Sequence, residues 1–313
     1  MVFNFHFHRD AKLDGFYCKQ TQEALDRWGL KHHTYLKRFT YEEYFDPIEE
    51  ELFLSDFFKS AEVQSNFEVS LVLRKRAIQH AAYFRKEIVT DQKDENGNCI
   101  WKTIGPNTTT LNNITHDDIP NRAEVKYERL NATVVSLEYF DRLVDNGIIR
   151  PSGAFVKCLP TVLTVPGMPN DVTVLDELHL LMLDPSSPKR DVFGEADRRE
   201  FIFHVFRALY LGGDLCQYDD DAGSYFEVTK RIYREMICLI VHLTTSVQKD
   251  PQSDKLEIRS PVFKIVSVTL HQCGNEATPL FPIEHSLNFC YLTVDPVRRL
   301  VTVWYHAAPE YFC

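Results

Sequence analysis

The segment from Ala196 to Leu211 has the firmest helical pattern in the sequence. Acidic residues lead the segment and Gly212 and Gly213 follow it, the order expected for the start and the end of a helix. Its apolar residues lie on one stripe at helical spacing: Phe201, Ile202, Val205, Phe206 and Leu209. A helix with such a stripe buries it against another element, so this segment requires a partner surface.

The next segment predicts that partner. Ser224 and Glu227 have the spacing of a capping box, in which two side chains satisfy free backbone groups at the start of a helix. Apolar residues then recur at helical spacing as far as Val241. We therefore predict an antiparallel helix pair joined by a loop from Gly212 to Gly223.

Strand patterns occur at both ends of the chain. Phe3, Phe5 and Phe7 alternate with polar residues, which is the period of a strand with one buried face. Three segments near the other end are also strand-like: Pro261 to Leu270, Phe289 to Val294, and Leu300 to Tyr305. The last two flank a turn from Asp295 to Arg299, so a C-terminal β-hairpin is expected.

Helical signals fill much of the sequence between these strands. They are Thr21 before Gln22 to Leu25, Thr40 followed by Glu43, Asp46-Pro47 opening a helix to about Lys59, Ser136 to Asp145, and about Val172 to Leu183. The helix ending near Lys59 carries Ile48, Leu52, Phe53 and Phe57 on one side. With no βαβ rhythm and no internal repeat, the pattern favours an α+β fold: mixed, with β-strands at both ends around a helix-rich middle.

Residues 67–122 have a different character. The expected elements are a strand from Phe67 to Leu73, a hairpin of Tyr83 to Val89 with Cys99 to Ile104, and a polar loop from Asn107 to Arg122. A single domain over 1–313 is the expected organisation. An N-terminal lobe at 1–122 with a second lobe at 123–313 is the alternative.

The composition excludes several classes of protein. Hydrophobic residues make up 44% and charged residues 26% of the chain, the balance of a globular protein. The net charge is -10 and the longest basic run is Arg74-Lys75-Arg76, so no nucleic-acid partner is expected. No apolar stretch approaches the ~20 residues of a membrane span, and the N-terminus lacks a secretory pattern, which predicts a soluble protein without a membrane partner.

Motifs for chemistry are missing from the sequence. His6 and His8 share a strand face and form a weak metal candidate, for which an exposed polar face is the simpler explanation. Asp219 to Asp221 do not fit the spacing of a calcium loop, and Gly212-Gly213 is not part of a phosphate loop. We predict no catalytic residue, no cofactor and no metal. An enzyme that depends on a metal or nucleotide, with a dispersed site, is the competing class.

Several segments resemble a known family. Leu211-Gly-Gly-Asp-Leu-Cys-Gln-Tyr218 is similar to the hallmark of the cilia- and flagella-associated protein 300 family. Further similarities follow the family's order: Tyr139 to Leu143, Ile149 to Gly153, Val156 to Leu159, Thr229 to Tyr233, and Val294 to Arg299 before Tyr305-His306. Relative to that family, 91–118 looks like a flexible insertion, and 123–313 would hold the family core.

The resemblance implies a non-catalytic protein of the cytoplasm and of the axoneme in the cilium or flagellum. It implies an adaptor or assembly factor for outer and inner axonemal dynein arms, supporting ciliary motility. The implied partners are dynein assembly factors and co-chaperones, dynein-arm components and the intraflagellar transport machinery. A structural component bound permanently to the axoneme is an alternative.

The loop between the predicted helices is the candidate partner-binding site, since it is rich in acids and carries tyrosines that could act as anchors. The candidate residues are Asp214, Gln217, Tyr218, Asp219, Asp220, Asp221 and Tyr225. In the alternative interpretation, Gln217 and Tyr218 only fasten the two helices together.

Overall fold

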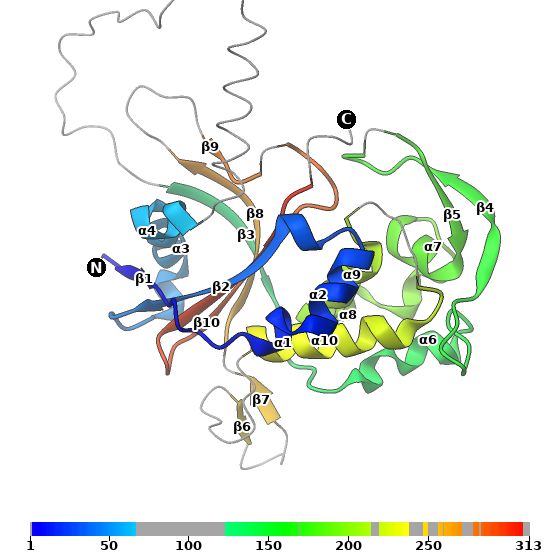
Figure 1. The fold of residues 1–313 in the computed structure, drawn as a ribbon, viewed down its shortest axis with the longest axis horizontal. Coiled ribbons are helices and arrows are strands. Elements are labelled where there is room, and N and C mark those ends of the chain that lie inside the picture. The colour runs from blue at the N-terminus through cyan, green and yellow to red at the C-terminus, as the bar shows by residue number, and fades with distance from the viewer. Residues whose placement is uncertain are drawn as a thin grey trace, which may run out of the picture.

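The strand-like segments from the two ends of the chain lie in one antiparallel sheet (Figure 1). Its seven strands include the path β1-β2-β11-β10-β8-β3, and β9 pairs with β8. The bounds are β1 Phe5–Phe7, β2 Thr34–Tyr41, β3 Ala123–Leu130, β8 Val262–Leu270, β9 Thr278–Pro279, β10 Phe289–Asp295 and β11 Leu300–His306. Together with the helices, this sheet confirms the predicted α+β class.

The structure is a computed structural model that describes residues 2–66, 123–168, 170–213, 219–237, 247–249, 256–258, 260–270, 278–281 and 283–308. The strand, hairpin and loop expected between Phe67 and Arg122 lie outside these ranges. Within them, no helix is both long and apolar enough to cross a membrane.

The C-terminal hairpin is confirmed. Strand β10 pairs with β11 along its full length, from Phe289 opposite His306 to Asp295 opposite Leu300. The Asp295 carboxylate stabilises the turn, because its Oδ1 accepts hydrogen bonds from the backbone N–H groups of Val297 and Arg298 at 3.0 and 2.9 Å.

Strand β2 is a correction to the sequence prediction. Thr40 was expected to begin a helix that includes Glu43, but Thr40 lies in β2, opposite Leu300 of β11. Both faces of this strand are covered, so its burial does not alternate and the sequence shows no clear period of two.

Helix α3 (Glu50–Lys59) covers one face of the sheet, together with α4 (Ala61–Asn66) and the 3₁₀ turn η2 (Pro47–Glu49) (Figure 1). Phe53 packs edge-on against Phe5 at 5.1 Å between ring centroids, and Phe57 against Phe39 at 5.3 Å. The predicted start is confirmed, since Asp46 caps the backbone N–H of Ile48. Ile48 itself is 90% exposed, which contradicts its predicted place on the buried side.

The remaining helices pack on the opposite face of the sheet or continue that layer (Figure 1). They are α1 Asp14–Tyr17, α2 Lys19–Arg27, η1 Lys31–His33, η3 Leu137–Phe140, α6 Asp141–Asp145, α7 Glu177–Leu183, η4 Arg190–Val192, α8 Glu195–Arg198, α9 Phe201–Leu211 and α10 Ala222–Met236. Trp304 of β11 and Tyr291 of β10 belong to this core, so the central hairpin contributes to both layers.

The antiparallel helix pair is α9 with α10. The start of α9 contacts the end of α10 through Phe201 and Tyr233, and its end contacts the start of α10 through Tyr210 and Tyr225, each at 5.6 Å between centroids. The predicted cap is wrong: Asp221 caps α10 by accepting from the N–H of Gly223, and Ser224 lies inside the helix. The predicted continuation to Val241 passes beyond the described residues.

Three other predicted helices differ in detail. The segment from Ala196 to Leu211 is divided into α8 and α9, because the backbone forms a bridge between Asn131 and Glu200 at the break. The segment from Val172 begins as strand β5 (Val172–Asp176), paired with β4 (Lys157–Leu163), before α7. Helix α2 begins at Lys19, so Thr21 lies within it and is not its cap.

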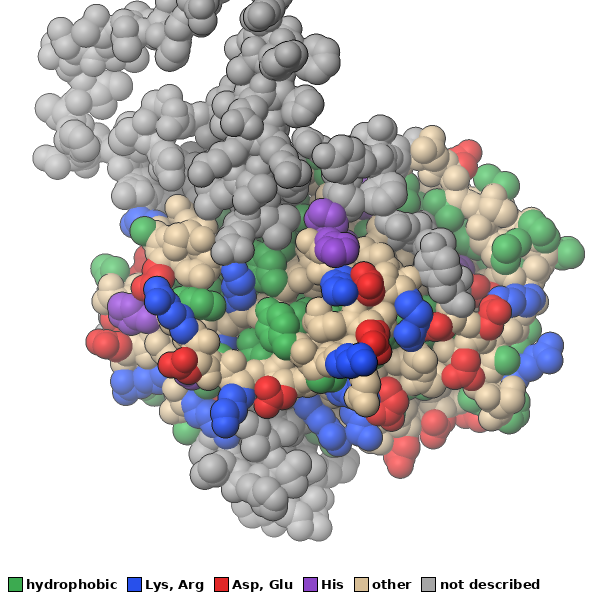
Figure 2. Space-filling model, in the orientation of Figure 1, with side chains coloured by type: hydrophobic (Ala, Val, Ile, Leu, Met, Phe, Trp, Pro, Cys, Tyr) green, Lys and Arg blue, Asp and Glu red, His purple; other side chains and the backbone are tan. Residues whose placement is uncertain are grey.

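The helix expected from Ser136 to Asp145 is present, with η3 as its first turn and Ser136 as the cap. A separate small hairpin consists of β6 (Val247–Lys249) and β7 (Leu256–Ile258). Acidic and basic side chains are interspersed over the face of the molecule shown in Figure 2. That distribution differs from the continuous basic surface of a nucleic-acid-binding protein.

Candidate functional site

The described part of the candidate loop lies where the start of α10 meets the end of α2. Asp214, Gln217 and Tyr218 lie outside the described residues. Asp219 to Asp221 and Tyr225 are described, and each has a different environment. We call this region the α2–α10 junction and define it by Arg27 to Gly29, Gly153, Lys157, Gly212 to Gly213 and Asp219 to Tyr225.

Asp219 fastens the junction. Its Oδ2 accepts a hydrogen bond from the indole Nε1–H of Trp28 at 2.9 Å and lies 3.2 Å from the guanidinium of Arg27. Trp28 is only 1% exposed, and a buried indole N–H requires an acceptor. Asp219 therefore has a structural role: it accepts the hydrogen bond of the Trp28 indole and balances the charge of Arg27.

Asp220 and Asp221 remain on the surface. The Asp220 side chain is 81% exposed and its Oδ1 lies 2.6 Å from Nζ of Lys157. The backbone of Asp220 is fixed, since its carbonyl accepts from the N–H of Phe155 at 3.1 Å. Asp221 is exposed and holds the first turn of α10. These two carboxylates have fixed positions and are open to solvent.

Tyr225 is buried, which contradicts the expectation that the loop presents this ring to a partner. Its side chain has no exposed surface and stacks on Trp28, with 4.3 Å between centroids and 14° between planes. A fully buried ring offers no contact surface. Tyr225 packs α10 against α2, while the partner-binding role of the exposed acids stays a prediction.

Three glycines bring the backbones at the junction together. Gly212 has φ +65° and ψ -163°, and a Cβ there would lie 2.5 Å from the carbonyl oxygen of Trp28. A Cβ on Gly213 would lie 2.2 Å from the carbonyl oxygen of Gly29, and one on Gly153 2.3 Å from Oδ2 of Asp221. Gly212, Gly213 and Gly153 belong to segments that resemble the family, and each approaches its neighbour too closely to carry a side chain.

Sequence reasoning missed the other half of the junction. No sequence pattern connected Trp28 and Gly29 with the candidate loop, whereas in the structure they contact Asp219 and Gly213. The available signal was Trp28 itself. A large indole at the end of an amphipathic helix needs another side chain to pack against it and an acceptor for its N–H. Lys157 carried no comparable signal.

A buried polar cluster joins α7 to α9. The Asp176 carboxylate lies 2.8 Å from Nδ1 of His179, and the Tyr210 hydroxyl donates to Asp176 at 2.6 Å. Burial acts to raise the pKa of Asp176, but the hydrogen bonds from His179 and Tyr210 outweigh it and lower that pKa. Asp176 and the Tyr210 hydroxyl both contact Nδ1 of His179. In a catalytic triad, by contrast, the acid contacts one imidazole nitrogen and the nucleophile contacts the other.

The residues suggested as metal ligands do not converge. His6 Nδ1 lies 3.2 Å from a carboxylate oxygen of Glu62, and both side chains are largely exposed. Among the described residues, no group of three or more His, Cys, Asp or Glu side chains is placed to hold a metal ion.

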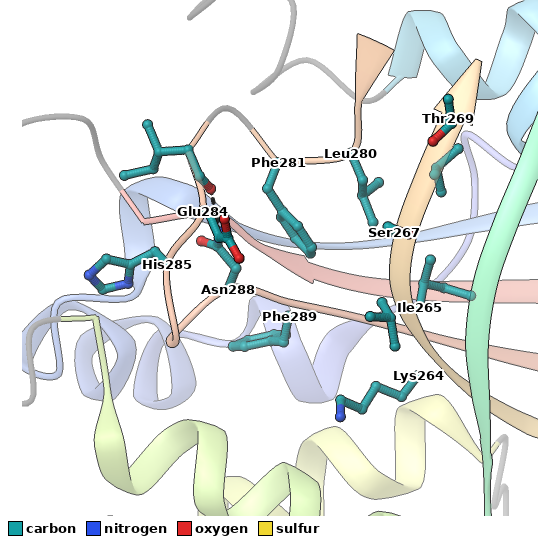
Figure 3. A pocket seen from close by; sticks show the side chains of 13 residues that line it. Lys264, Ile265, Ser267, Thr269, Leu280, Phe281, Glu284, His285, Asn288 and Phe289 are labelled. Atoms are coloured by element: carbon teal, nitrogen blue, oxygen red, sulfur yellow. Dashed lines mark hydrogen bonds between the residues drawn. The ribbon is translucent and has the colours of Figure 1, made fainter. Parts of the chain in front are cut away.

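A cavity of about 620 Å³ lies between β8 and the segment leading into β10 (Figure 3). Leu280 and Phe281 lie beside β8 on one side of it, and Phe289 lies below them. Strand β8 pairs with β10 only from Val262 to Lys264, so the two strands separate beyond that point and leave this space.

Comparison with known proteins identifies the family. The family model of cilia- and flagella-associated protein 300 matches residues 2–90 and 102–306. A relative of that name from Chlamydomonas reinhardtii is 28% identical over 304 residues, which cover 96% of this chain and 95% of the relative. One from Paramecium tetraurelia is 24% identical over 285 residues, which cover 91% and 86%. No solved structure matches this chain.

The matched ranges bear on the proposed insertion. Residues 91–101 are unmatched and fall inside the stretch 91–118, whereas the rest of that stretch is matched. The match spans both faces of the sheet and every described residue of the α2–α10 junction. The chain therefore belongs to the cilia- and flagella-associated protein 300 family.

Proposed function

We propose that this protein is a non-catalytic adaptor or assembly factor for outer and inner axonemal dynein arms, and that it supports ciliary motility. It acts in the cytoplasm and in the axoneme of the cilium or flagellum. Its proposed partners are dynein assembly factors and their co-chaperones, dynein-arm components and the intraflagellar transport machinery.

Family membership over nearly the whole chain is the observation that carries this proposal, since the related proteins are named for association with cilia and flagella. The junction supports a binding role in a second way. Asp220 and Asp221 are exposed on a backbone that hydrogen bonds hold in place. A rigid presentation lowers the entropy that is lost when a partner binds.

Exposed carboxylates on a fixed backbone suit a partner with a basic surface. Complementary charge increases the rate of encounter and fixes the orientation of the two proteins. Asp220 and Asp221 can serve this role because their side chains face solvent, whereas Asp219 is engaged with Trp28. The proposed contact surface therefore includes fewer residues than the sequence predicted.

The experiment compares charge-reversed and wild-type protein in ciliating cells. We expect Asp220→Lys with Asp221→Asn to reduce capture of dynein assembly factors from cell extract, because the first change reverses a charge and the second keeps a capping side chain on α10. Arm content of the axonemes is then scored by electron microscopy after replacement of the endogenous protein.

A matched control alters charge elsewhere. Glu124→Lys with Asp145→Asn makes the same change in net charge at two other exposed acids. If both folded variants capture the same proteins as the wild type, the junction is not the contact surface. If axonemes of cells without the protein keep both sets of arms, the proposed function itself is wrong.

A further inference from the structure

A second cavity, of about 320 Å³, lies between α9 and the sheet where β8 and β10 begin to pair. Its polar lining comes from Arg198, His204, Arg207, Lys264, Ser286, Asn288 and Tyr291, and the Tyr291 hydroxyl lies 3.3 Å from Nδ1 of His204. Lys264 and Asn288 also line the larger cavity and are seen there in Figure 3. This lining includes three cationic residues and no Asp or Glu, in a chain whose net charge is -10.

Two of the three cations have their own partners. Lys264 lies 2.9 Å from a carboxylate oxygen of Glu128. Arg198 donates to the backbone carbonyls of Phe193 and Arg190, at 3.0 and 3.1 Å. These contacts hold both charged groups in place, although the Lys264 ammonium keeps two further N–H donors.

Arg207 is different. In the described part of the chain, its guanidinium makes no hydrogen bond and no ion pair within the protein. Loss of hydration lowers the pKa of Arg207, and the neighbouring Tyr291 opposes that shift only in part. The guanidinium thus keeps its five N–H donors free of acceptors among the described residues at the cavity, where an anion would make stronger, charge-assisted hydrogen bonds with it than water does.

The surrounding groups are donors or neutral. His204 lies one helical turn before Arg207, and burial, followed by the charges of Lys264 and Arg207, lowers its pKa to about 3. His204 is therefore uncharged at neutral pH. Ser286 belongs to the lining of the cavity, and its Oγ is buried without a partner in the described structure, so its hydroxyl has an unused donor.

We propose that this cavity binds the phosphate group of a small phosphate ester or of free phosphate, with Arg207 as its principal ligand. A guanidinium matches two phosphate oxygens with parallel hydrogen bonds, and Lys264 and the Ser286 hydroxyl supply further donors. A space of about 320 Å³ exceeds the needs of a bare phosphate ion, so an ester with a small organic group fits the cavity better.

The test titrates the purified full-length protein with inorganic phosphate and with glycerol 3-phosphate at constant ionic strength. We expect saturable heats of binding and a rise in unfolding temperature with both probes, because each binds the native state. Tighter binding of glycerol 3-phosphate identifies an ester as the ligand, and equal binding identifies free phosphate. Acetate tests whether a carboxylate suffices, and we expect it to bind more weakly.

Arg207→Met removes the charge but keeps much of the side-chain stem. We expect it to weaken binding roughly tenfold to hundredfold, the range for loss of charge-assisted hydrogen bonds. Arg199→Met is the matched control, since Arg199 is exposed, precedes the first residue of α9 and lies outside the cavity. Ser286→Ala gives a second, independent reduction if Arg207→Met does not fold.

The outcomes distinguish a role of Arg207 in binding phosphate from a role in stabilising the fold. Because Arg207 has no protein partner in the described structure, Arg207→Met is expected to keep its unfolding temperature in phosphate-free buffer while losing the response to phosphate. Absence of saturable binding by the wild type overturns the proposal. So does binding that Arg207→Met and Ser286→Ala leave unchanged.

Discussion

At the scale of single residues, Gly212 allows the backbone after α9 to lie directly against the end of α2. Its backbone angles lie in a region that only glycine occupies readily, and an added Cβ would meet the Trp28 carbonyl. We expect Gly212→Ala to lower the free energy of unfolding by about 3 kcal/mol or more, from strain and overlap together. Urea denaturation measures this change.

Gly147 is the matched control for that substitution. It also has a positive φ, +61°, but an added Cβ would meet no atom within 4 Å. Gly147→Ala is expected to lower the free energy of unfolding only through the strain of a left-handed backbone, by roughly 1–2 kcal/mol. Equal losses at the two positions would show that close approach to Trp28 contributes nothing.

The three consecutive acids of the junction should also differ in their effect on stability. Asp219→Ala leaves the buried indole N–H of Trp28 without its acceptor, which costs about 1–3 kcal/mol. Asp220→Ala removes only an exposed ion pair with Lys157, worth ~0–1 kcal/mol. Thermal and urea unfolding of the two variants measure the difference. A larger loss for Asp220→Ala would contradict the assignment of Asp219 as the structural acid.

At the scale of the elements, α3 is held by its aromatic side chains. Phe57 is fully buried and lies against Phe5 and Phe39 of the sheet, at 5.0 and 5.3 Å between centroids. Phe57→Ala should therefore cost about 3–5 kcal/mol. Ile48→Ala, at a side chain that is 90% exposed, should leave the free energy of unfolding nearly unchanged. A substantial loss for Ile48→Ala would restore the original sequence prediction for this helix.

The end of α10 is attached to α1 and to the sheet through Glu235. Its Oε1 accepts from the N–H of Gly15 at 2.8 Å, and Arg38 of β2 donates to its backbone carbonyl at 3.0 Å. Burial raises the pKa of the Glu235 carboxyl above 4.5, and the contacts with Gly15 and Arg38 offset this only in part. The protonated form is thus favoured more in the folded state than in the unfolded state.

A pH dependence follows from that shift. Since the folded protein holds this proton more tightly, the stabilising contribution of Glu235 is present below pH 4.5 and is lost as the pH rises through the folded pKa. Glu235→Gln should remove this decline, because the amide stays neutral and its oxygen still accepts from Gly15. Urea denaturation over a pH series compares it with Glu227→Gln, an exposed control that should keep the decline.

The elements also show what sequence patterns can predict. Helix α9 was found from its apolar stripe at helical spacing. Strands β10 and β11 are buried on both faces, and they were found because a turn signal separates two strand-like segments. Strand β2 is also covered on both faces, but it was missed because no predicted hairpin turn beside it marks it as a strand. The exposed acids of the junction were found from their charge, but the pairing of Asp219 with Trp28 joins positions 191 residues apart and leaves no local pattern.

At the scale of the whole molecule, the N-terminal strands and the C-terminal hairpin depend on each other. Strand β2 pairs with β11 from Thr34 opposite His306 to Thr40 opposite Leu300. Leu36 and Trp28 also enter the core on the helical side. A fragment of residues 123–313 would lack these strands and side chains and would expose the edge of β11, which promotes aggregation.

We therefore expect residues 123–313 expressed alone to lack the dispersed amide spectrum and near-ultraviolet circular dichroism of a packed protein. Co-expression with residues 1–66 should restore both signals, because that fragment supplies β1, β2 and α3. A well-dispersed spectrum from 123–313 alone would instead support two lobes that fold independently, at 1–122 and 123–313.

The pairing of β2 with β11 has a consequence for biosynthesis. A ribosome adds about 5–20 residues per second, so Tyr41 leaves it tens of seconds before His306 does. During that interval an aromatic-rich strand has no native neighbour on one side, and its free edge can pair with other nascent chains. We therefore expect the first strands to depend on shielding in the cell until translation is nearly complete.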